Sequence, residues 1–232
     1  MNQEIFLAKR VNWLKEVADQ CHKYATQLDV DFYVFQTPCE QYNPDLLIIG
    51  INPGGGKGYN EMLLKNHWVK RPFESLQQDV NTLTTKPYWE IESKEKGADY
   101  MRFRMSKVFT AKNNLKEILE NAVMMNICYF NTKDESLMNK SISQEVQNFC
   151  AIKTLEFIEI LNPKNILIIS SSVKNIGKLQ VRGINQINKF IKEGFINDRR
   201  VYTIPHYASR TGAYSEIEGN NLGVKLKSLF KE

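Results

Sequence analysis

The sequence has little of what a metal-binding protein needs. It contains three histidines and four cysteines, and no two of Cys21, Cys39, Cys128 and Cys150 form a C-x-x-C pair. None of the histidines stands at a zinc-ligand spacing from a cysteine. This pattern argues against a structural zinc or an iron–sulfur cluster, and we expect no bound metal. Reduced, packed thiols in a cytosolic protein are the simpler interpretation.

Long apolar runs are also missing. The first ten residues, MNQEIFLAKR, carry charges where a signal peptide has its apolar core. No stretch approaches the about 20 apolar residues that a membrane-spanning helix requires. We therefore expect a soluble, cytoplasmic protein without a membrane partner. The formal net charge of +5 is compatible with a polyanionic partner but is only a weak indication of one.

The sequence also shows no internal repeat, low-complexity tract or linker. Its 232 residues are therefore expected to form one domain, residues 1–232, with a substantial buried core. A hydrophobic fraction of 42% and a charged fraction of 25% are ordinary for a globular protein.

What the sequence does contain is an alternation of apolar strands and amphipathic helices. Helical spacing of apolar residues predicts helices at residues 5–28, 105–119, 143–161, 185–191 and 220–232. Continuous apolar runs predict buried strands at residues 46–49, 121–130, 164–170 and 200–205. The alternation favours an α/β fold, and we expect a three-layer α/β/α domain around a central, mainly parallel, four-stranded sheet. Residues 58–104 lack clean periodicity, and such an excursion after a strand usually covers or lines a site.

Three of the predicted strands carry a polar side chain at or near their ends. The stretch PDLLIIGINPGGGKGYN (44–60) runs from a buried strand into Asn52, Pro53 and three consecutive glycines. Pro53 biases Asn52 towards extended backbone, which gives the amide a defined direction. Ligands of open parallel sheets bind beyond the carboxyl ends of the strands. We therefore expect Asn52, Asn126 and His206 to lie around one site.

The glycine-rich turn matches neither common phosphate-binding motif. A P-loop requires Gly, four residues and then Gly-Lys-Ser/Thr. Alignment on Gly56 and Lys57 puts Ile51 at the first glycine and Gly58 at the hydroxyl position. The dinucleotide fingerprint G-x-G-x-x-G would need a glycine at Tyr59. The sequence therefore predicts no nucleotide cofactor, and a merely flexible turn remains an alternative.

Three short motifs resemble those of the uracil-DNA glycosylase superfamily, and they occur in the family's order. GINPGG (50–55) resembles the Gly-(Ile/Met)-Asn-Pro-Gly motif of the mismatch-specific and single-strand-selective branches. MNICYF (125–130) resembles the strand motif that reads His-Asn-Leu-Cys-Pro in the single-strand-selective enzymes. IPHYASR (204–210) resembles the closing His-Pro-Ser-Pro-Arg loop. The single-strand-selective branch looks nearest, and the first motif is the most specific of the three.

The resemblance implies a role for each matching residue in cutting the bond between a base and its sugar. Asn52 would orient the attacking water, and neutral His206 would donate a hydrogen bond to O2 of the departing base. Asn126 would read the O4 and N3–H edge of uracil, since one amide carries both a donor and an acceptor. The other implied contacts are Gly50, Ile51, Pro53, the backbone of Gly54 and the stacking aromatic Phe73 for the base, and Lys57, Ser209 and Arg210 for DNA phosphates.

Structural alternatives stay open for these residues. The asparagine after the first strand could cap its own turn, and the one in MNICYF could serve a neighbouring strand. The ring nitrogens of His206 could form hydrogen bonds with nearby backbone groups and have no other role. Tyr59 and Trp68 are alternatives to Phe73 as the stacking aromatic.

The predicted function is that of a monofunctional DNA glycosylase that removes uracil or a related damaged base from DNA, as in base excision repair. It would act without metal or cofactor, on single- or double-stranded DNA, as a monomer. Activity is expected to be slow, because the amide of Asn52 orients the water but cannot take its proton. The alternative is a catalytically weak or inactive nucleic-acid or base-binding protein, favoured by Tyr207-Ala208 in place of the family's Pro-Ser. Hydrolysis or binding of a small nucleoside or nucleotide is a third hypothesis.

Overall fold

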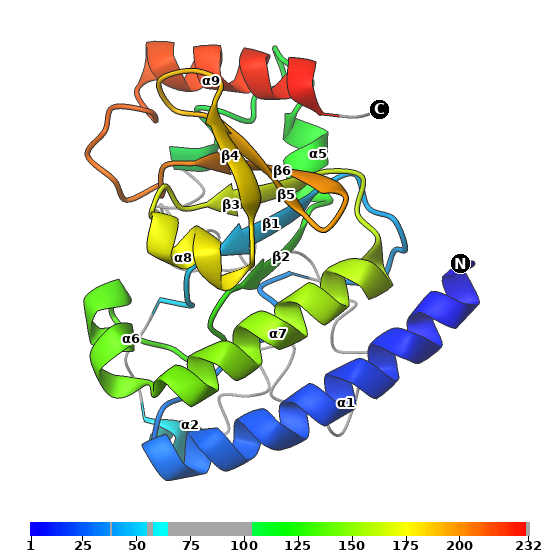
Figure 1. Ribbon diagram of the computed structural model, residues 1–232, viewed down its shortest axis with the longest axis vertical. Helices are drawn as coiled ribbons and strands as arrows, with labels where there is room; N and C mark the ends of the chain where they lie inside the picture. The colour runs from blue at the N-terminus through cyan, green and yellow to red at the C-terminus, as the bar shows by residue number, and fades with distance from the viewer. Residues whose placement is uncertain (38, 55–57, 65–103, 231–232) are drawn as a thin grey trace.

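The computed structural model describes residues 1–37, 39–54, 58–64 and 104–230, which form an α/β fold (Figure 1). The sheet has six strands in the order β2-β1-β3-β6-β5-β4. The strands are β1 Leu47–Gly50, β2 Val123–Asn126, β3 Ile166–Ile169, β4 Arg182–Gln186, β5 Lys192–Ile196 and β6 Arg199–Ile204.

The sheet is mixed. β1 pairs in parallel with β2 and with β3, and β3 pairs in parallel with β6. β5 then runs antiparallel to β6, and β4 antiparallel to β5. The prediction of a four-stranded sheet is therefore corrected to six strands, of which β1, β2, β3 and β6 form a parallel block. The antiparallel hairpin at the edge was not foreseen.

Helices cover both sides of this sheet. Asn2, Ser143 and Ser215 cap the starts of three of them, each accepting a hydrogen bond from a backbone N–H three residues further on. Asp29 and Asn162 end the two longest helices in the left-handed conformation. The described helices are α1 Gln3–Leu28, α2 Tyr59–Leu64, α5 Lys116–Glu120, α6 Glu135–Ser141, α7 Gln144–Leu161, α8 Val173–Lys178 and α9 Glu216–Leu229.

Apolar side chains of the parallel strands reach both faces of the sheet, because successive residues of a strand alternate. Leu47 and Ile49 of β1 lie in the hydrophobic cluster that includes α1 and α7, whereas Ile48 lies in the cluster that includes α9. Burial of each such side chain stabilises the fold by about 1.5–3 kcal/mol. Figure 1 shows α9 on one side of the sheet and α7 and α1 on the other, which is compatible with a three-layer α/β/α arrangement.

The helix predicted at residues 105–119 is largely wrong. Residues 106–114 form turns, and α5 begins only at Lys116. The Asn113 side chain accepts from the N–H of Thr110 (3.1 Å) and donates to the carbonyl of Val108 (2.8 Å). Such side-chain bonds to backbone compete with helical ones, which explains the interruption.

The helix predicted at residues 185–191 is also wrong, because this segment belongs to the β4–β5 hairpin. Asn188 Oδ1 accepts from the N–H groups of Phe190 (2.9 Å) and Ile191 (2.8 Å) and closes the turn. Of the aperiodic segment 58–104, residues 65–103 lie outside the described ranges. None of the described helices combines the length and apolar character needed to cross a membrane.

Candidate functional site

The candidate site lies at the carboxyl ends of the parallel strands. β1 and β2 end side by side, with Gly50 paired to Asn126, and Asn52 follows two residues beyond Gly50. His206 follows β6, which only β3 separates from β1. Since these strands run parallel, the three polar side chains come from the same edge of the sheet. In Figure 1 this edge faces α6 and α8.

Asn126 packs directly against Gly50. A Cβ atom at position 50 would lie 2.4 Å from the Oδ1 of Asn126, so only glycine leaves room for this amide. The two chains stay paired beyond β1, because Ile127 N–H donates to the carbonyl of Gly50 (3.0 Å) and Cys128 N–H to that of Ile51 (2.9 Å). The first glycine of GINPGG therefore has a packing role next to Asn126.

The amide nitrogen of Asn126 has no hydrogen-bond partner among the described residues, although the residue is only 1% exposed. A buried donor left unpaired costs about 1–3 kcal/mol. The backbone carbonyl, by contrast, accepts from Thr154 Oγ1 (3.2 Å). Among the described residues, no neighbouring strand accepts a hydrogen bond from the side-chain nitrogen, which leaves it able to donate to a ligand.

Asn52 is held by the segment that follows β2. Its Nδ2 lies within donating distance of the carbonyl oxygen of Thr132 (3.0 Å), Thr132 Oγ1 (2.9 Å) and the carbonyl of Pro53 (3.0 Å). With the nitrogen engaged in this way, Oδ1 is the end of the amide left to accept a hydrogen bond. The bond to Pro53 is local, as the turn-capping alternative requires. The two contacts with Thr132 are long-range, so the amide is held by more than its own turn.

His206 is held as one tautomer. Its Nδ1 accepts a hydrogen bond from the backbone N–H of Ala208 (3.2 Å), so in the neutral ring the proton is on Nε2. Burial lowers the pKa of His206 below its ordinary value, and the negative charge of Glu135 acts in the opposite direction. The ring is therefore neutral at pH 7 and offers an Nε2–H donor.

Two side chains fix the loop that carries His206. Arg104 donates to the carbonyl oxygens of Tyr207 (3.1 Å) and Ser209 (3.2 Å). The hydroxyl of Tyr214 donates to the carbonyl of Pro205 (2.6 Å). These contacts hold the backbone of the loop in place, and no sequence motif indicated Arg104 or Tyr214.

A carboxylate that the sequence did not single out, Glu135, belongs to the same edge. It is the first residue of α6, which is tied to Asn52 through Thr132. Thr132 Oγ1 accepts from Asn52 (2.9 Å) and donates to the carbonyl of Asp134 (3.1 Å). Glu135 is half-buried, and its charge acts on His206. In the sequence it is simply an acidic residue in the first turn of a helix, so no signal distinguished it.

The remaining predicted residues lie on loops at this edge or outside the described ranges. After β1, Ile51 is half-buried, Pro53 is buried and Gly54 is exposed. After β6, Ser209 is half-buried and Arg210 is exposed. The predicted residues outside the described ranges are Lys57, Trp68 and Phe73.

Tyr59 is a core residue and not a free stacking aromatic. It is 7% exposed, its hydroxyl bonds to His22 Nδ1, and its ring centroid lies 6.4 Å from that of Phe32. Next to it, the N–H of Asn60 donates to Asp29 Oδ1 (3.0 Å). These contacts anchor the chain beyond the glycine-rich turn to the end of α1.

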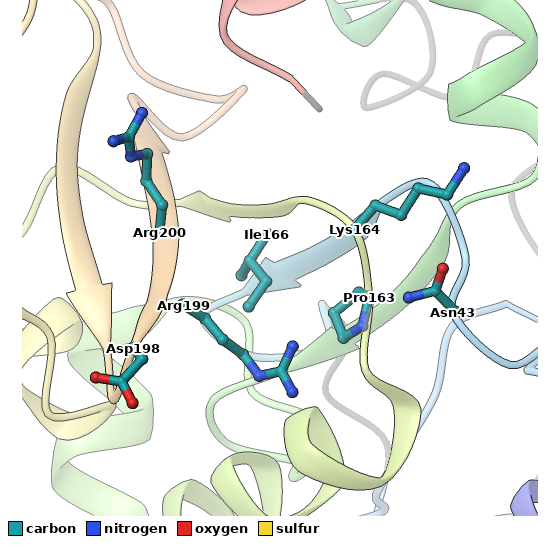
Figure 2. A pocket seen from close by; sticks show the side chains of 7 residues that line it. All are labelled: Asn43, Pro163, Lys164, Ile166, Asp198, Arg199 and Arg200. Atoms are coloured by element: carbon teal, nitrogen blue, oxygen red, sulfur yellow. The ribbon is translucent and has the colours of Figure 1, made fainter. Parts of the chain in front are cut away.

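A pocket of about 430 Å³ lies at the opposite edge, near the amino ends of β3 and β6. Neighbouring carboxylates neutralise its cations: Asp45 pairs with Lys164 (2.8 Å) and Glu159 with Arg199 (3.2 Å). Figure 2 shows that the charged ends point in different directions, so they do not converge on a ligand. The lining residues are Asn43, Pro163, Lys164, Ile166, Asp198, Arg199 and Arg200.

The described residues include no group of three or more His, Cys, Asp or Glu side chains placed to hold a metal ion. The four cysteines are buried and free. Burial raises the pKa of Cys39 to about 12 and that of Cys150 well above its ordinary value, as expected of unreactive packed thiols.

No protein-family model matches the chain, and no curated protein matches it at a significant level. Function has to be inferred from the side chains at the carboxyl edge of the sheet.

Proposed function

We propose that this protein is a monofunctional DNA glycosylase that hydrolyses the bond between deoxyribose and uracil or a related damaged base. One observation carries the proposal: three complementary polar groups belong to one edge of the sheet. They are the amide acceptor of Asn52, the unpaired amide donor of Asn126 and the Nε2–H donor of His206. A uracil flipped out of DNA presents two carbonyl oxygens that such donors can bind.

Each group has its own task in the proposed reaction. Asn126 donates to O4 of uracil, where cytosine has an amino group that would leave the donor unpaired. His206 donates to O2, on which negative charge collects as the bond to the sugar breaks. One donor of this kind contributes about 10²- to 10³-fold to a rate. The Oδ1 of Asn52 accepts a hydrogen bond from the water that attacks the sugar.

The finer assignments belong to the same proposal. The fold would be the three-layer, uracil-DNA glycosylase-like domain, and the enzyme would act as a monomer on single- or double-stranded DNA. The loop with Ser209 and Arg210 would contact phosphates, because it follows His206 at the same edge of the sheet. Water is the nucleophile and hydrogen bonds stabilise the leaving base, so the reaction requires no cofactor.

Base release tests the proposal. A panel of oligonucleotides, each with one modified pyrimidine, is incubated with the protein, and free base and alkali-labile sites are measured. We expect release of at least one base, and losses of about 100-fold or more for Asn52→Ala and His206→Ala. Asn221→Ala, at an exposed position of α9, serves as the matched control. Failure of the wild-type protein to release any base refutes the proposed glycosylase activity. Undiminished release by Asn52→Ala or His206→Ala refutes the role of the substituted residue.

A protein that binds nucleic acids or bases without cutting them is the second candidate, and Tyr207 favours it. The Tyr207 ring stacks on the His206 imidazole, with centroids 4.1 Å apart and planes inclined by 34°. The aromatic ring therefore covers one face of the imidazole where the family has a proline. Binding of uracil-containing or abasic DNA, with no base released over hours, would support this candidate.

A further inference from the structure

We propose that Glu135 is the general base of this site and takes the proton of the water that Asn52 orients. The inference rests on the proposed glycosylase function. An amide cannot accept a full proton, so Asn52 orients the water without activating it. In this proposal the carboxylate of Glu135, a half-buried residue, supplies the missing acceptor.

A short chain of hydrogen bonds joins Asn52 to the turn that carries Glu135. Asn52 Nδ2 donates to Thr132 Oγ1 (2.9 Å), which donates to the carbonyl of Asp134 (3.1 Å). The Asp134 side chain caps α6 by accepting from the N–H of Leu137 (2.8 Å). The first turn of α6 is therefore fixed relative to the end of β1, and Glu135 is the first residue of that turn.

The charge of Glu135 acts on ionisable groups from two other elements. On the loop after β6, the pKa of His206 is lowered by burial and raised by the charge of Glu135. On α8, burial lowers the pKa of Lys178, and Glu135 again acts in the opposite direction. The Lys178 amine donates to Gln147 Oε1 (2.6 Å), which directs it to α7. Glu135 therefore lies within electrostatic reach of His206 while its own turn is tied to Asn52.

The proposed step balances without any further reactant. Water adds through its oxygen to C1′ of the deoxyribose as the bond from C1′ to N1 of the base breaks. The electron pair of that bond leaves with the base, whose O2 accepts a hydrogen bond from His206 Nε2. One proton of the water passes to the Glu135 carboxylate. The base anion then takes up a proton, and Glu135 returns to its ionised form.

The test compares Glu135→Gln with Glu145→Gln on the oligonucleotide that the wild-type protein cleaves. Both glutamates lie in the first turn of a helix, and Glu145 is exposed at the start of α7. We expect kcat to fall about 100-fold or more in Glu135→Gln, with KM changed less than about threefold and activity partly restored in Glu135→Asp. Glu145→Gln should match the wild type. Equal kcat values for Glu135→Gln and the wild type would overturn the role.

A second readout separates the two proposals. Titration of the His206 ring by NMR should move to lower pH in Glu135→Gln, because the negative charge that raises its pKa is gone. An unchanged titration would overturn the placement of Glu135, whatever the activity. Absence of base release from the wild-type protein overturns the glycosylase function, and the general base with it. Release by the wild type and equally by Glu135→Gln overturns the role of Glu135 alone.

Discussion

The Nδ1 atom of His206 accepts a hydrogen bond from the backbone N–H of Ala208, two residues further along the chain. The bond places the proton of the neutral imidazole on Nε2. Because the contact lies within one loop, the tautomer is set before any ligand arrives. Such preorganised donors contribute to catalysis without reorganising at the moment of reaction.

Stability is expected to fall at mildly acid pH because of this histidine. Burial lowers the pKa of folded His206, so the unfolded chain takes up a proton near pH 6.5 while the folded chain does not. The unfolded state then binds more protons, and the free energy of unfolding decreases as pH drops from about 6.5 towards the folded-state pKa. Chemical denaturation at several pH values between 5 and 7 gives the free energy of unfolding as a function of pH. This pH dependence should be weaker in His206→Asn than in the wild type. Burial also lowers the pKa of His22, so part of the pH dependence should remain in the variant. The same pH dependence of stability in His206→Asn and the wild type would contradict the prediction.

Gly50→Ala should impair both stability and base release. The new Cβ would lie 2.4 Å from Asn126 Oδ1, and the amide must move. We expect a loss of about 1–3 kcal/mol in the free energy of unfolding, as for other overpacked sites. Gly54→Ala is the control for stability, because no heavy atom of the described residues lies within 4 Å of its added Cβ. Equal unfolding midpoints for the two variants would show that the packing at Gly50 is not tight.

Asn126→Ala should separate function from stability. The substitution removes packing contacts, which destabilises the fold, but it also removes a buried donor that has no partner among the described residues. Because the two effects oppose each other, the free energy of unfolding should change by less than about 1 kcal/mol. Base release should nevertheless fall about 100-fold. Asn113→Ala is the comparison, because this buried asparagine makes bonds to Thr110, Leu115 and Val108 and should lose more than about 1 kcal/mol. A larger loss of stability in Asn126→Ala than in Asn113→Ala would indicate that Asn126 has a structural role.

Thr132→Val tests whether Asn52 must be held. The substitution removes the hydroxyl that accepts from Asn52 and donates to Asp134, at nearly constant shape. We expect a loss of about 1 kcal/mol in stability and about tenfold in kcat, because the amide loses one of its anchors. Thr26→Val, at an exposed position of α1 where the hydroxyl donates to the carbonyl of His22 (2.8 Å), should keep the wild-type kcat. An unchanged kcat in Thr132→Val would show that Asn52 needs no such support.

Arg210→Ala should weaken DNA binding without changing which base is released. A phosphate contact contributes to affinity independently of sequence. Its loss should make the negative slope of log K against log salt shallower by about 1. The control is Arg182→Ala in β4, an exposed arginine of the edge hairpin. Fluorescence anisotropy at several salt concentrations measures both slopes, and identical slopes for the two variants would refute the contact.

Helices and parallel strands were predictable where their signal is local. α1 and α7 span Gln3–Leu28 and Gln144–Leu161, close to the ranges that apolar spacing predicted. β3 and β6 lie within or close to their predicted apolar runs, since a strand buried on both faces is apolar throughout. Local patterning was sufficient in these cases because burial alone selects the residues.

The β4–β5 hairpin could not be predicted in the same way. β4 is exposed at every position, so its composition carries no burial signal. Its strand conformation comes from pairing with β5, and β5 in turn pairs with β6. Tertiary pairing overrode the weak helical spacing of residues 185–191.

By itself the sequence determined which polar residues stand at the strand ends, because Asn52, Asn126 and His206 interrupt or follow apolar runs. Only the tertiary structure decided how their polar atoms are used. Asn52 is bonded to Thr132, 80 residues further along the chain, and the Thr132 hydroxyl donates to the carbonyl of Asp134, the residue before α6. Hydrogen bonds between distant segments depend on three-dimensional geometry, which no local pattern encodes.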